Sequence, residues 1–335
     1  MKKSILILGV LALISCSATK TQQTDFNYKE IGKISDSITI QNITILNLFK
    51  SQILAHKNSK FDSAMIVKQV YFPHKKLWDS CYAQIFGDQN AKLFNTEKGM
   101  IGWNRTLFDK GRTDFIAKTK SITDINVNKL LKTNLDKFNR LVPFQPSAKI
   151  SLLFTPITGI GFGGCDSQQF AFEINNTSLD VLYTLEKGLP HELNHLVYEK
   201  FRNADADKNT ALSQTIDEGF ACYFTYVFFD EKIPEHEAVE NMTKENWEWF
   251  VKHEKDIFIK TKPYFSDSSG NNPLLRNDRH KLFPEAPKTL NYWLGYRIVS
   301  QYVEKHGKHS WKDIYRLTPK EVLEKSGYEK YIEKL

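Results

Sequence analysis

The sequence predicts an α+β protein that is mainly helical and contains a small sheet. Apolar residues recur at three-to-four spacing through most of the chain, and two short segments near its middle have the apolar texture of strands. The 335 residues are long enough to bury a sizeable core. A composition of 41% hydrophobic and 25% charged residues is ordinary for a soluble globular protein.

The first residues have the layout of a bacterial signal peptide. Lys2 and Lys3 precede an apolar stretch from Ile5 to Ile14, which is too short to cross roughly 30 Å of hydrocarbon. Residues 13–16, Leu-Ile-Ser-Cys, resemble a lipobox, so we expect residues 1–15 to be removed and Cys16 to carry lipid. Residues 16–27 would then form a tether. The alternative is a plain secretory signal in which Cys16 has no such role.

These features predict an exported protein that is lipid-anchored to a bacterial membrane, on the periplasmic or cell-surface side. Removal of residues 1–15 lowers the formal charge from +7 to +5, and the remaining charge is spread along the chain, so we expect no nucleic-acid partner. Cys81, Cys165 and Cys222 are odd in number and form no CxxC pair. We therefore expect these cysteines to be buried thiols. The alternative is that two of them form one disulfide. The sequence does not indicate an oligomeric state.

Residues 28–147 are expected to form a helical N-terminal region, and Pro143 and Pro146 mark its end. Residues 149–155 then predict a buried strand and residues 169–174 an alternating one. Residues 159–164 are glycine-rich but lack the lysine of a phosphate-binding P-loop, which favours a hairpin connection. The apolar positions that predict the N-terminal helices are Ile45, Leu48, Phe49, Leu54, Leu130, Leu131, Leu135 and Phe138.

Helices return after residue 176. Pro190 suits the first turn of one helix, and residues 210–229 carry the apolar stripe of a second, core-facing helix. A loop rich in Asp, Ser, Asn and Pro is expected at 265–288. Further helices are predicted over residues 290–306 and about 319–331.

The first of these helices carries the motif HExxH in residues 191–195. A helix that turns about 100° per residue places His191 and His195 on one face, where both imidazoles can bind one metal ion. The carboxylate of Glu192 can reach a water on that ion without being a ligand, as a general base requires. The structural alternative is an amphipathic helix with two surface histidines.

Glu218 is the candidate third ligand. It lies between Ile216 and Phe220 in the stripe of the second helix, so it should be partly buried, and an unpaired buried carboxylate is costly. The alternative is a solvated glutamate at the edge of the stripe.

The motifs also resemble a known family. HExxH followed by the segment DEGFA at residues 217–221 is similar to the gluzincin metallopeptidases. More closely, PHELNHLVYEKF, IDEGFACYF and NYWLGYRIVSQYVEKHG resemble the YjaZ-like predicted zinc-dependent proteases over about residues 148–330. The resemblance implies a zincin-like metallopeptidase domain over residues 148–335. In it, His191, His195 and Glu218 would hold Zn²⁺, Glu192 would be the base, and Asp217 would support a histidine ligand.

Gluzincins usually add a Tyr or His that stabilises the oxyanion. Tyr292 and Tyr296 are four apart on one helix face, and Gly295 between them would permit close helix packing. His280 is a weaker candidate, and core packing alone is the alternative for each tyrosine. A zincin-like fold also implies that strand 169–174 lies along the cleft and pairs with an extended peptide.

The function expected from these residues is peptide-bond hydrolysis by a membrane-anchored zinc peptidase, with a peptide or protein as substrate. One alternative is a lipoprotein binding module or metal carrier without turnover, although a carrier would need no Glu192. Another is a zinc hydrolase of a non-peptide substrate, because the metal chemistry is shared.

Overall fold

The computed structural model describes residues 26–57, 60–79, 88–155, 162–166, 169–175 and 180–335. Cys16, Cys81 and residues 159–161, the first half of the glycine-rich connection, lie outside these residues. Among the described residues, none of the helices combines the length and the apolar character that crossing a bilayer requires.

Helices account for most of the described chain, and they are accompanied by one small sheet, as the sequence predicts. In chain order the principal elements are α1 (Tyr28–Lys33), β1 (Ser37–Ile40), β2 (Ile43–Leu46), α2 (Leu48–Leu54), α3 (Ser63–Ile66), α4 (Lys75–Leu77), α6 (Asp88–Phe94), α7 (Glu97–Asp124), α8 (Val127–Leu141), β3 (Ala148–Leu153), β4 (Phe162–Asp166), β5 (Gln169–Glu173), α9 (Val181–Tyr183), α10 (Leu189–Arg202), α11 (Ala211–Phe228), α12 (Glu235–Ala238), α13 (Lys244–Lys252), α14 (Glu254–Thr261), α15 (Asn277–His280), α16 (Leu290–His306), α17 (Pro319–Ser326) and α18 (Tyr328–Lys334).

The sheet has five strands in the order β1-β2-β3-β5-β4. The central pairs β2–β3 and β3–β5 are parallel, whereas the outer pairs β1–β2 and β4–β5 are antiparallel. Successive side chains of a strand point to opposite faces, so β2, β3 and β5 contribute to two cores. Ile150 and Phe172 belong to the main core, while Leu153 and Ala171 pack in a second core under α3, α4, α6 and α7.

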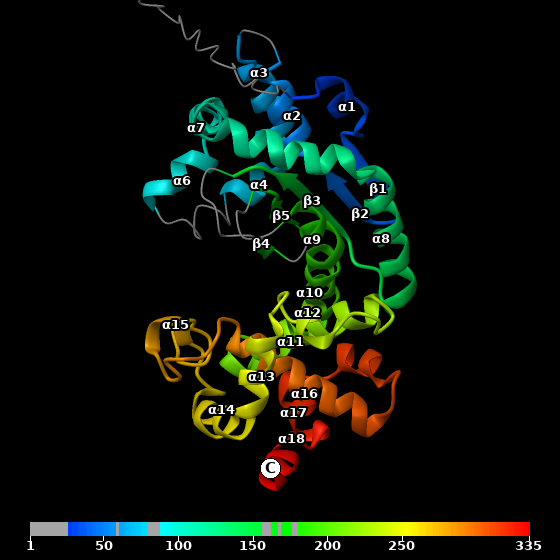
Figure 1. Cartoon of the computed structure of the whole chain (residues 1–335), viewed down its shortest axis with the longest axis vertical. Helices are drawn as coiled ribbons and strands as arrows, with labels where there is room; N and C mark the ends of the chain where they lie inside the picture. The colour runs from blue at the N-terminus through cyan, green and yellow to red at the C-terminus, as the bar shows by residue number, and fades with distance from the viewer. Residues whose placement is uncertain (1–25, 58–59, 80–87, 156–161, 167–168, 176–179) are drawn as a thin grey trace, which may run out of the picture.

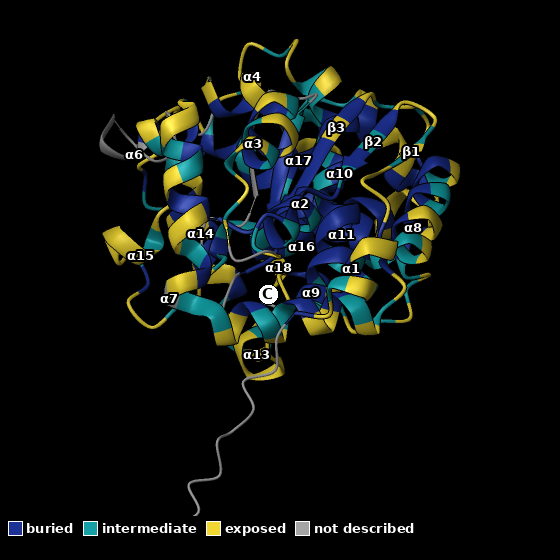
Figure 2. Ribbon diagram, turned by 90° about the horizontal axis from the view of Figure 1, so that it is seen from above, coloured by how far each residue is buried: buried dark blue, intermediate teal, exposed yellow. Residues whose placement is uncertain are grey.

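The main core extends beyond the sheet into the C-terminal helices. It runs from Phe26 to Ile332 and includes the buried faces of α8, α10, α11 and α16. In Figure 1 the sheet and α7 occupy one end of the molecule, α10 leads away from the sheet, and α18 lies at the opposite end. Figure 2 shows the buried residues gathered in β2, β3, α10 and α11, with exposed residues on the outer helices.

The N-terminal half departs from the helical expectation in one segment. Residues 37–46 form the β1–β2 hairpin, and Gln41 at its turn has a left-handed φ of 52°. Ile45, which the helical pattern included, is a buried strand residue, whereas Leu48, Phe49 and Leu54 do lie on α2. Because β2 pairs directly with β3, the expected division at residue 148 runs through one sheet.

Candidate metal centre

The HExxH motif lies near the start of α10. Helical backbone runs from Val181 through a π-helical turn at Thr184–Gly188 into α10, and Pro190 occupies the first turn, where no backbone N–H is needed. Leu193 and Val197 face the core and fix the rotation of the helix. This rotation leaves His191 at 7% exposure and turns His195 and Glu192 toward partly accessible space.

Three donor atoms from two helices converge beside this motif. Nε2 of His191 lies 3.2 Å from Nε2 of His195, and Oε2 of Glu218 on α11 lies 3.3 Å from each of these nitrogens. The structure therefore brings together the three side chains that the sequence predicts as ligands, and they form one compact group.

The spacing of these atoms suits a tetrahedral ion. Zinc binds nitrogen and oxygen ligands at about 2.0–2.1 Å, which sets the ligand–ligand edge of a regular tetrahedron at roughly 3.3–3.4 Å. The three edges of 3.2–3.3 Å agree with that value. Two imidazoles and one carboxylate are also a donor set that catalytic zinc sites use.

His195 is held from its far side by a chain of charged contacts. Its Nδ1 lies 2.8 Å from Oδ1 of Asp217, whose second oxygen lies 3.0 Å from the guanidinium of Arg202. An Nδ1–H that donates to this carboxylate leaves Nε2 free to face Glu218 and His191. Asp217 thus lies where the resemblance places a supporting residue.

His191 has a different set of neighbours. Its Nδ1 lies 3.9 Å from Sγ of Cys222 on α11 and 4.0 Å from a carboxylate oxygen of Glu240. The ring of Tyr292 stacks against the imidazole, with ring centroids 6.2 Å apart and an interplanar angle of 19°. The side chain of His191 is therefore enclosed on several sides.

The cluster carries an excess of negative charge. Four carboxylates, those of Glu192, Asp217, Glu218 and Glu240, surround the two imidazoles, and Arg202 is the one guanidinium that contacts them among the described residues. Such an arrangement of partly buried acids favours a cation at its centre.

The pKa values of these groups reflect the same surrounding charges. Burial lowers the pKa of His195, but the carboxylates of Asp217 and Glu218 outweigh burial and hold that pKa well above its ordinary value. Burial raises the pKa of Glu192 to about 7, against the opposing effect of both imidazoles. For Glu218, the two histidines overcome burial and hold the pKa below the ordinary value.

Close helix contact brings α16 to the cluster. A Cβ atom on Gly295 would lie 1.9 Å from the carbonyl oxygen of Thr215, and one on Gly219 would lie 2.0 Å from the backbone of Gly295. Only glycine at both positions permits this approach, as the sequence predicts for Gly295. The contact places Tyr292 beside His191.

The other sequence candidates lie differently. Tyr296 is fully buried, and its hydroxyl donates to Glu235 at 3.1 Å. His280 is exposed on α15, and its ring contacts the backbone of Asn271. Of the three candidate oxyanion donors, only Tyr292 contacts the cluster among the described residues.

The expectation for strand 169–174 needs correction. Its counterpart β5 is paired on both sides, with β3 and with β4, so its backbone cannot accept an extended peptide. The edge strand on this side is β4, which begins inside the glycine-rich segment, so residues 162–164 are strand where a connection was expected from the sequence. A strand that pairs on both sides is satisfied internally, whereas an edge strand exposes unpaired N–H and C=O groups.

Sequence reasoning missed three residues of the cluster, namely Arg202, Cys222 and Glu240. Cys222 follows Glu218 by one helical turn, so helical spacing could have identified it as a neighbour. Arg202 lies eleven residues after His191, about three turns along the same helix. Glu240 comes from a loop after α12 with a left-handed φ of 54°, and no spacing rule connects it with HExxH.

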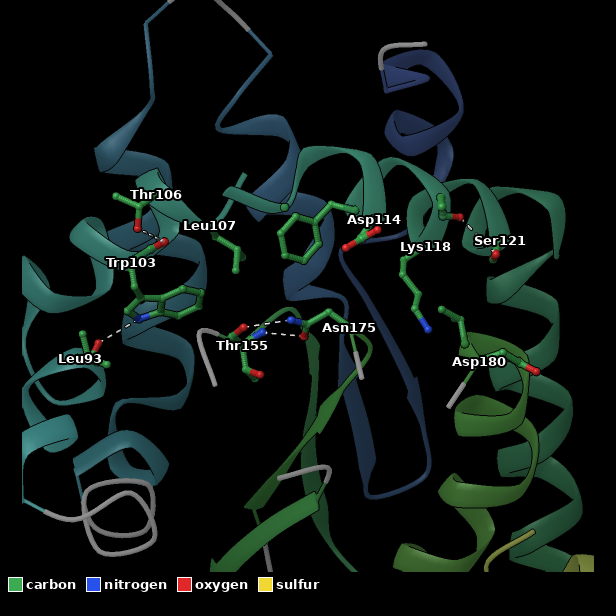
Figure 3. A pocket seen from close by; sticks show the side chains of 14 residues that line it. Leu93, Trp103, Thr106, Leu107, Asp114, Lys118, Ser121, Thr155, Asn175 and Asp180 are labelled. Carbon is green, nitrogen blue, oxygen red and sulfur yellow. Dashed lines mark hydrogen bonds between the residues drawn. The ribbon is translucent and has the colours of Figure 1, made fainter. Parts of the chain in front are cut away.

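A separate groove lies toward the end of the molecule that α7 occupies (Figure 1). It has a volume of about 770 Å³ and lies between α7 and the residues that follow β3 and β5. In Figure 3 Trp103 and Leu107 point toward it from α7, and Thr155 and Asn175 form two hydrogen bonds of 2.8 and 3.0 Å at its base. None of its lining residues belongs to the metal cluster.

Comparison with known proteins places the cluster within one family model. The model described as gliding motility protein GldB matches residues 182–330, a range that includes α10, α11 and α16. Neither a curated protein nor a solved structure matches the chain. The match supports a lipoprotein-type family and, with it, a lipid-anchored protein associated with a membrane.

Proposed function

We propose that this chain is a lipid-anchored, zinc-dependent peptidase. The observation that carries the proposal is the convergence of His191, His195 and Glu218, whose donor atoms lie 3.2–3.3 Å apart on two packed helices. The comparisons name no peptidase, so the proposal depends on this geometry and on the motifs.

A zinc ion held by these three residues would supply Lewis-acid activation of a water and of the scissile carbonyl. Glu192 follows the first ligand and is partly exposed, so its carboxylate can accept the proton of the attacking water and pass it to the leaving amine. Tyr292 can donate its hydroxyl proton in a hydrogen bond to the carbonyl oxygen, because burial and three nearby carboxylates raise the pKa of its hydroxyl and keep it protonated.

The family match favours a second candidate function. A gliding motility lipoprotein could use the same cluster to hold a metal for structure alone. This candidate and the peptidase make the same prediction for metal binding, but they differ in Glu192. A structural site needs three ligands and no neighbouring base.

The discriminating experiment replaces Glu192 by Gln, which retains the shape of the side chain and removes its basicity. The parent and the variant are incubated with a mixed peptide library, and zinc content is measured in the same samples. Glu186→Gln on the same helical run is the matched control, since Glu186 makes no contact with the cluster in the described residues.

We expect Glu192→Gln to retain zinc and to lose at least about 10²-fold in cleavage rate, while Glu186→Gln cleaves like the parent. A zinc-loaded parent that cleaves no peptide would refute the peptidase and leave the metal-holding motility lipoprotein. Equal cleavage by the parent and Glu192→Gln would remove Glu192 from the mechanism.

A further inference from the structure

The two halves of the chain differ in charge. Residues 26–141 contain 19 Lys and Arg against 10 Asp and Glu, whereas residues 142–335 contain 24 against 28. Although charged residues occur along the whole chain, the net positive charge is therefore concentrated in residues 26–141. The proposed metal centre lies entirely in the acidic part.

Part of this basic charge surrounds an aromatic cluster where the described chain begins. The ring of Phe26 packs on Phe108 of α7 with centroids 5.4 Å apart, and His56 lies between Phe61 and Phe108 at 4.8 and 4.3 Å. The hydroxyl of Tyr28 donates to the carbonyl of His56 at 3.2 Å. These contacts join α1, the segment after α2 and the first half of α7 into one surface.

Basic side chains border that surface. The guanidinium of Arg105 lies 5.4 Å from the ring centroid of Phe61, and that of Arg112 lies 5.3 Å from the centroid of Phe26. Arg105 precedes and Arg112 follows a kink of α7 at Gly111, so their contacts with Phe61 and Phe26, and not helical spacing, place both beside the aromatic cluster. We call the surface that carries Lys29, Lys57, Lys60, Arg105 and Arg112 the N-terminal face; its three lysines and Arg105 are exposed.

The acidic residues near this face offset only part of its charge. Glu30 forms an ion pair with Lys33 at 2.7 Å, and Asp62 accepts a hydrogen bond from the backbone of Met65 at the start of α3. Asp109 is the remaining exposed acid on this part of α7. Four exposed basic residues, Lys29, Lys57, Lys60 and Arg105, therefore outnumber the two exposed acids on this face, Asp62 and Asp109.

The position of the N-terminus identifies the partner of this face. Nine residues lie between Cys16 and Phe26, and the ten Cα–Cα steps that join these two residues span at most about 35 Å when the chain is fully extended. A lipid on Cys16 would thus hold the molecule close to a bilayer by the end at which α1, α2, α3 and α7 gather (Figure 1). A basic surface beside a lipid anchor is a second membrane signal, because anionic headgroups attract Lys and Arg.

We propose that the N-terminal face docks on anionic lipid headgroups and orients the molecule with its metal centre away from the bilayer. The proposal rests on the lipid-anchored part of the proposed function and not on peptidase activity. Attraction to a bilayer needs no pocket, only several basic residues on one surface within reach of the headgroups.

The test uses the chain from Ser17, made without lipid, which contains every residue that the structure describes. Its binding to vesicles of phosphatidylcholine, with and without a third of phosphatidylglycerol, is measured by co-sedimentation at low and at high salt. One variant combines Lys29→Gln, Lys57→Gln, Lys60→Gln and Arg105→Gln. The control combines Lys252→Gln, Lys255→Gln, Lys320→Gln and Lys330→Gln, which remove the same charge from exposed positions at the opposite end.

We expect the parent to bind anionic vesicles but not neutral ones, and to be released by salt. Each basic residue near an anionic surface changes binding by about fivefold, so the N-terminal variant should bind at least tenfold more weakly, while the control stays within about twofold of the parent. Circular dichroism and thermal melting verify that both variants fold.

Two results would overturn the proposal. One is a parent that does not bind anionic vesicles at low salt. The other is equal weakening in both variants, which would show that net charge and not this face governs binding. Failure of the anchor itself is detected separately, because Cys16→Ser in the full chain should then leave membrane association unchanged in cell fractionation.

Discussion

The two histidines of the cluster are held by different means. His195 has a charged support in Asp217 and Arg202, which fixes its tautomer and orientation. His191 is enclosed by a thiol, a more distant carboxylate and the ring of Tyr292. The sequence motif identifies both residues but says nothing of these supports, since they come from α11, α16 and a loop.

Tyr292 and Tyr296 allow a paired test of oxyanion stabilisation. Tyr292 contacts His191, whereas the hydroxyl of Tyr296 is engaged by Glu235. Loss of one such donor typically costs about 10²–10³ in kcat, so we expect Tyr292→Phe to fall in this range and Tyr296→Phe to stay within a few fold of the parent. Steady-state peptide cleavage with zinc content as a control measures the difference. Equal rates for the two variants would exclude Tyr292 as the donor.

His74 provides a test of stability against pH, remote from the cluster. It is fully buried, and both of its ring nitrogens lack a hydrogen-bond partner among the described residues. Burial, with a smaller effect of Lys149, lowers its pKa from 6.5 to about 3. In the unfolded chain the same imidazole takes up a proton as the pH falls through 6.5, which stabilises the unfolded state.

The free energy of unfolding should therefore fall by roughly 2 kcal/mol between pH 7 and pH 5 through His74 alone. In His74→Phe this contribution should be absent, while the exposed control His309→Phe should keep it. Urea unfolding at the two pH values measures the slopes. A slope in His74→Phe that equals that of the parent would mean that His74 is not buried in its neutral form.

At the scale of elements, the cluster depends on three helices, α10, α11 and α16. All three were predicted as helices: Pro190 and the HExxH motif indicated α10, an apolar stripe indicated α11, and residues 290–306 were expected to be helical. The close contact of α11 with α16 was only suggested, by Gly295. Gly219, its partner, lies inside the DEGFA segment, and no sequence rule indicates that the two glycines meet.

Replacement of Gly295 by Ala tests this contact. The added Cβ would meet the backbone carbonyl of Thr215, which cannot move unless the helices separate. We expect a loss of about 1–3 kcal/mol in the free energy of unfolding, together with weaker zinc binding, because Glu218 moves with α11.

Gly102→Ala on α7 is the matched control for Gly295→Ala. A Cβ there meets nothing within 4 Å, so the change should be neutral or stabilising by up to about 1 kcal/mol. Chemical denaturation compares the two variants. A stable Gly295→Ala protein with parental zinc affinity would contradict the packing described for α11 and α16.

The sheet was predicted from the sequence only in part. Strands β3 and β5 agree with the predicted ranges 149–155 and 169–174 to within two residues. The β1–β2 hairpin was missed, although Ser-Ile-Thr-Ile and Ile-Thr-Ile-Leu are runs of β-branched residues on either side of the Gln41–Asn42 turn. Strand order could not be read at all, because pairing of β2 with β3 joins segments about a hundred residues apart.

At the scale of the whole molecule, one core connects the sheet with the helices of the metal centre. Residues from Phe26 to Ile332 pack in a single cluster, so the helices that hold the ligands are braced by the sheet and by α8. The basic N-terminal face and the acidic metal centre lie on different parts of this body (Figure 1). The relative position of such distant surfaces depends on chain topology, which cannot be predicted from the spacing of residues along the sequence.

The most direct test of the account is the zinc content of the purified chain and of four single variants, measured by mass spectrometry after exposure to zinc and removal of the excess. We predict close to one zinc per chain in the parent and in Cys222→Ala, and little in His191→Ala, His195→Ala and Glu218→Ala. A parent without zinc, or a Glu218→Ala variant that retains it fully, would contradict the claim that these three side chains share one ion.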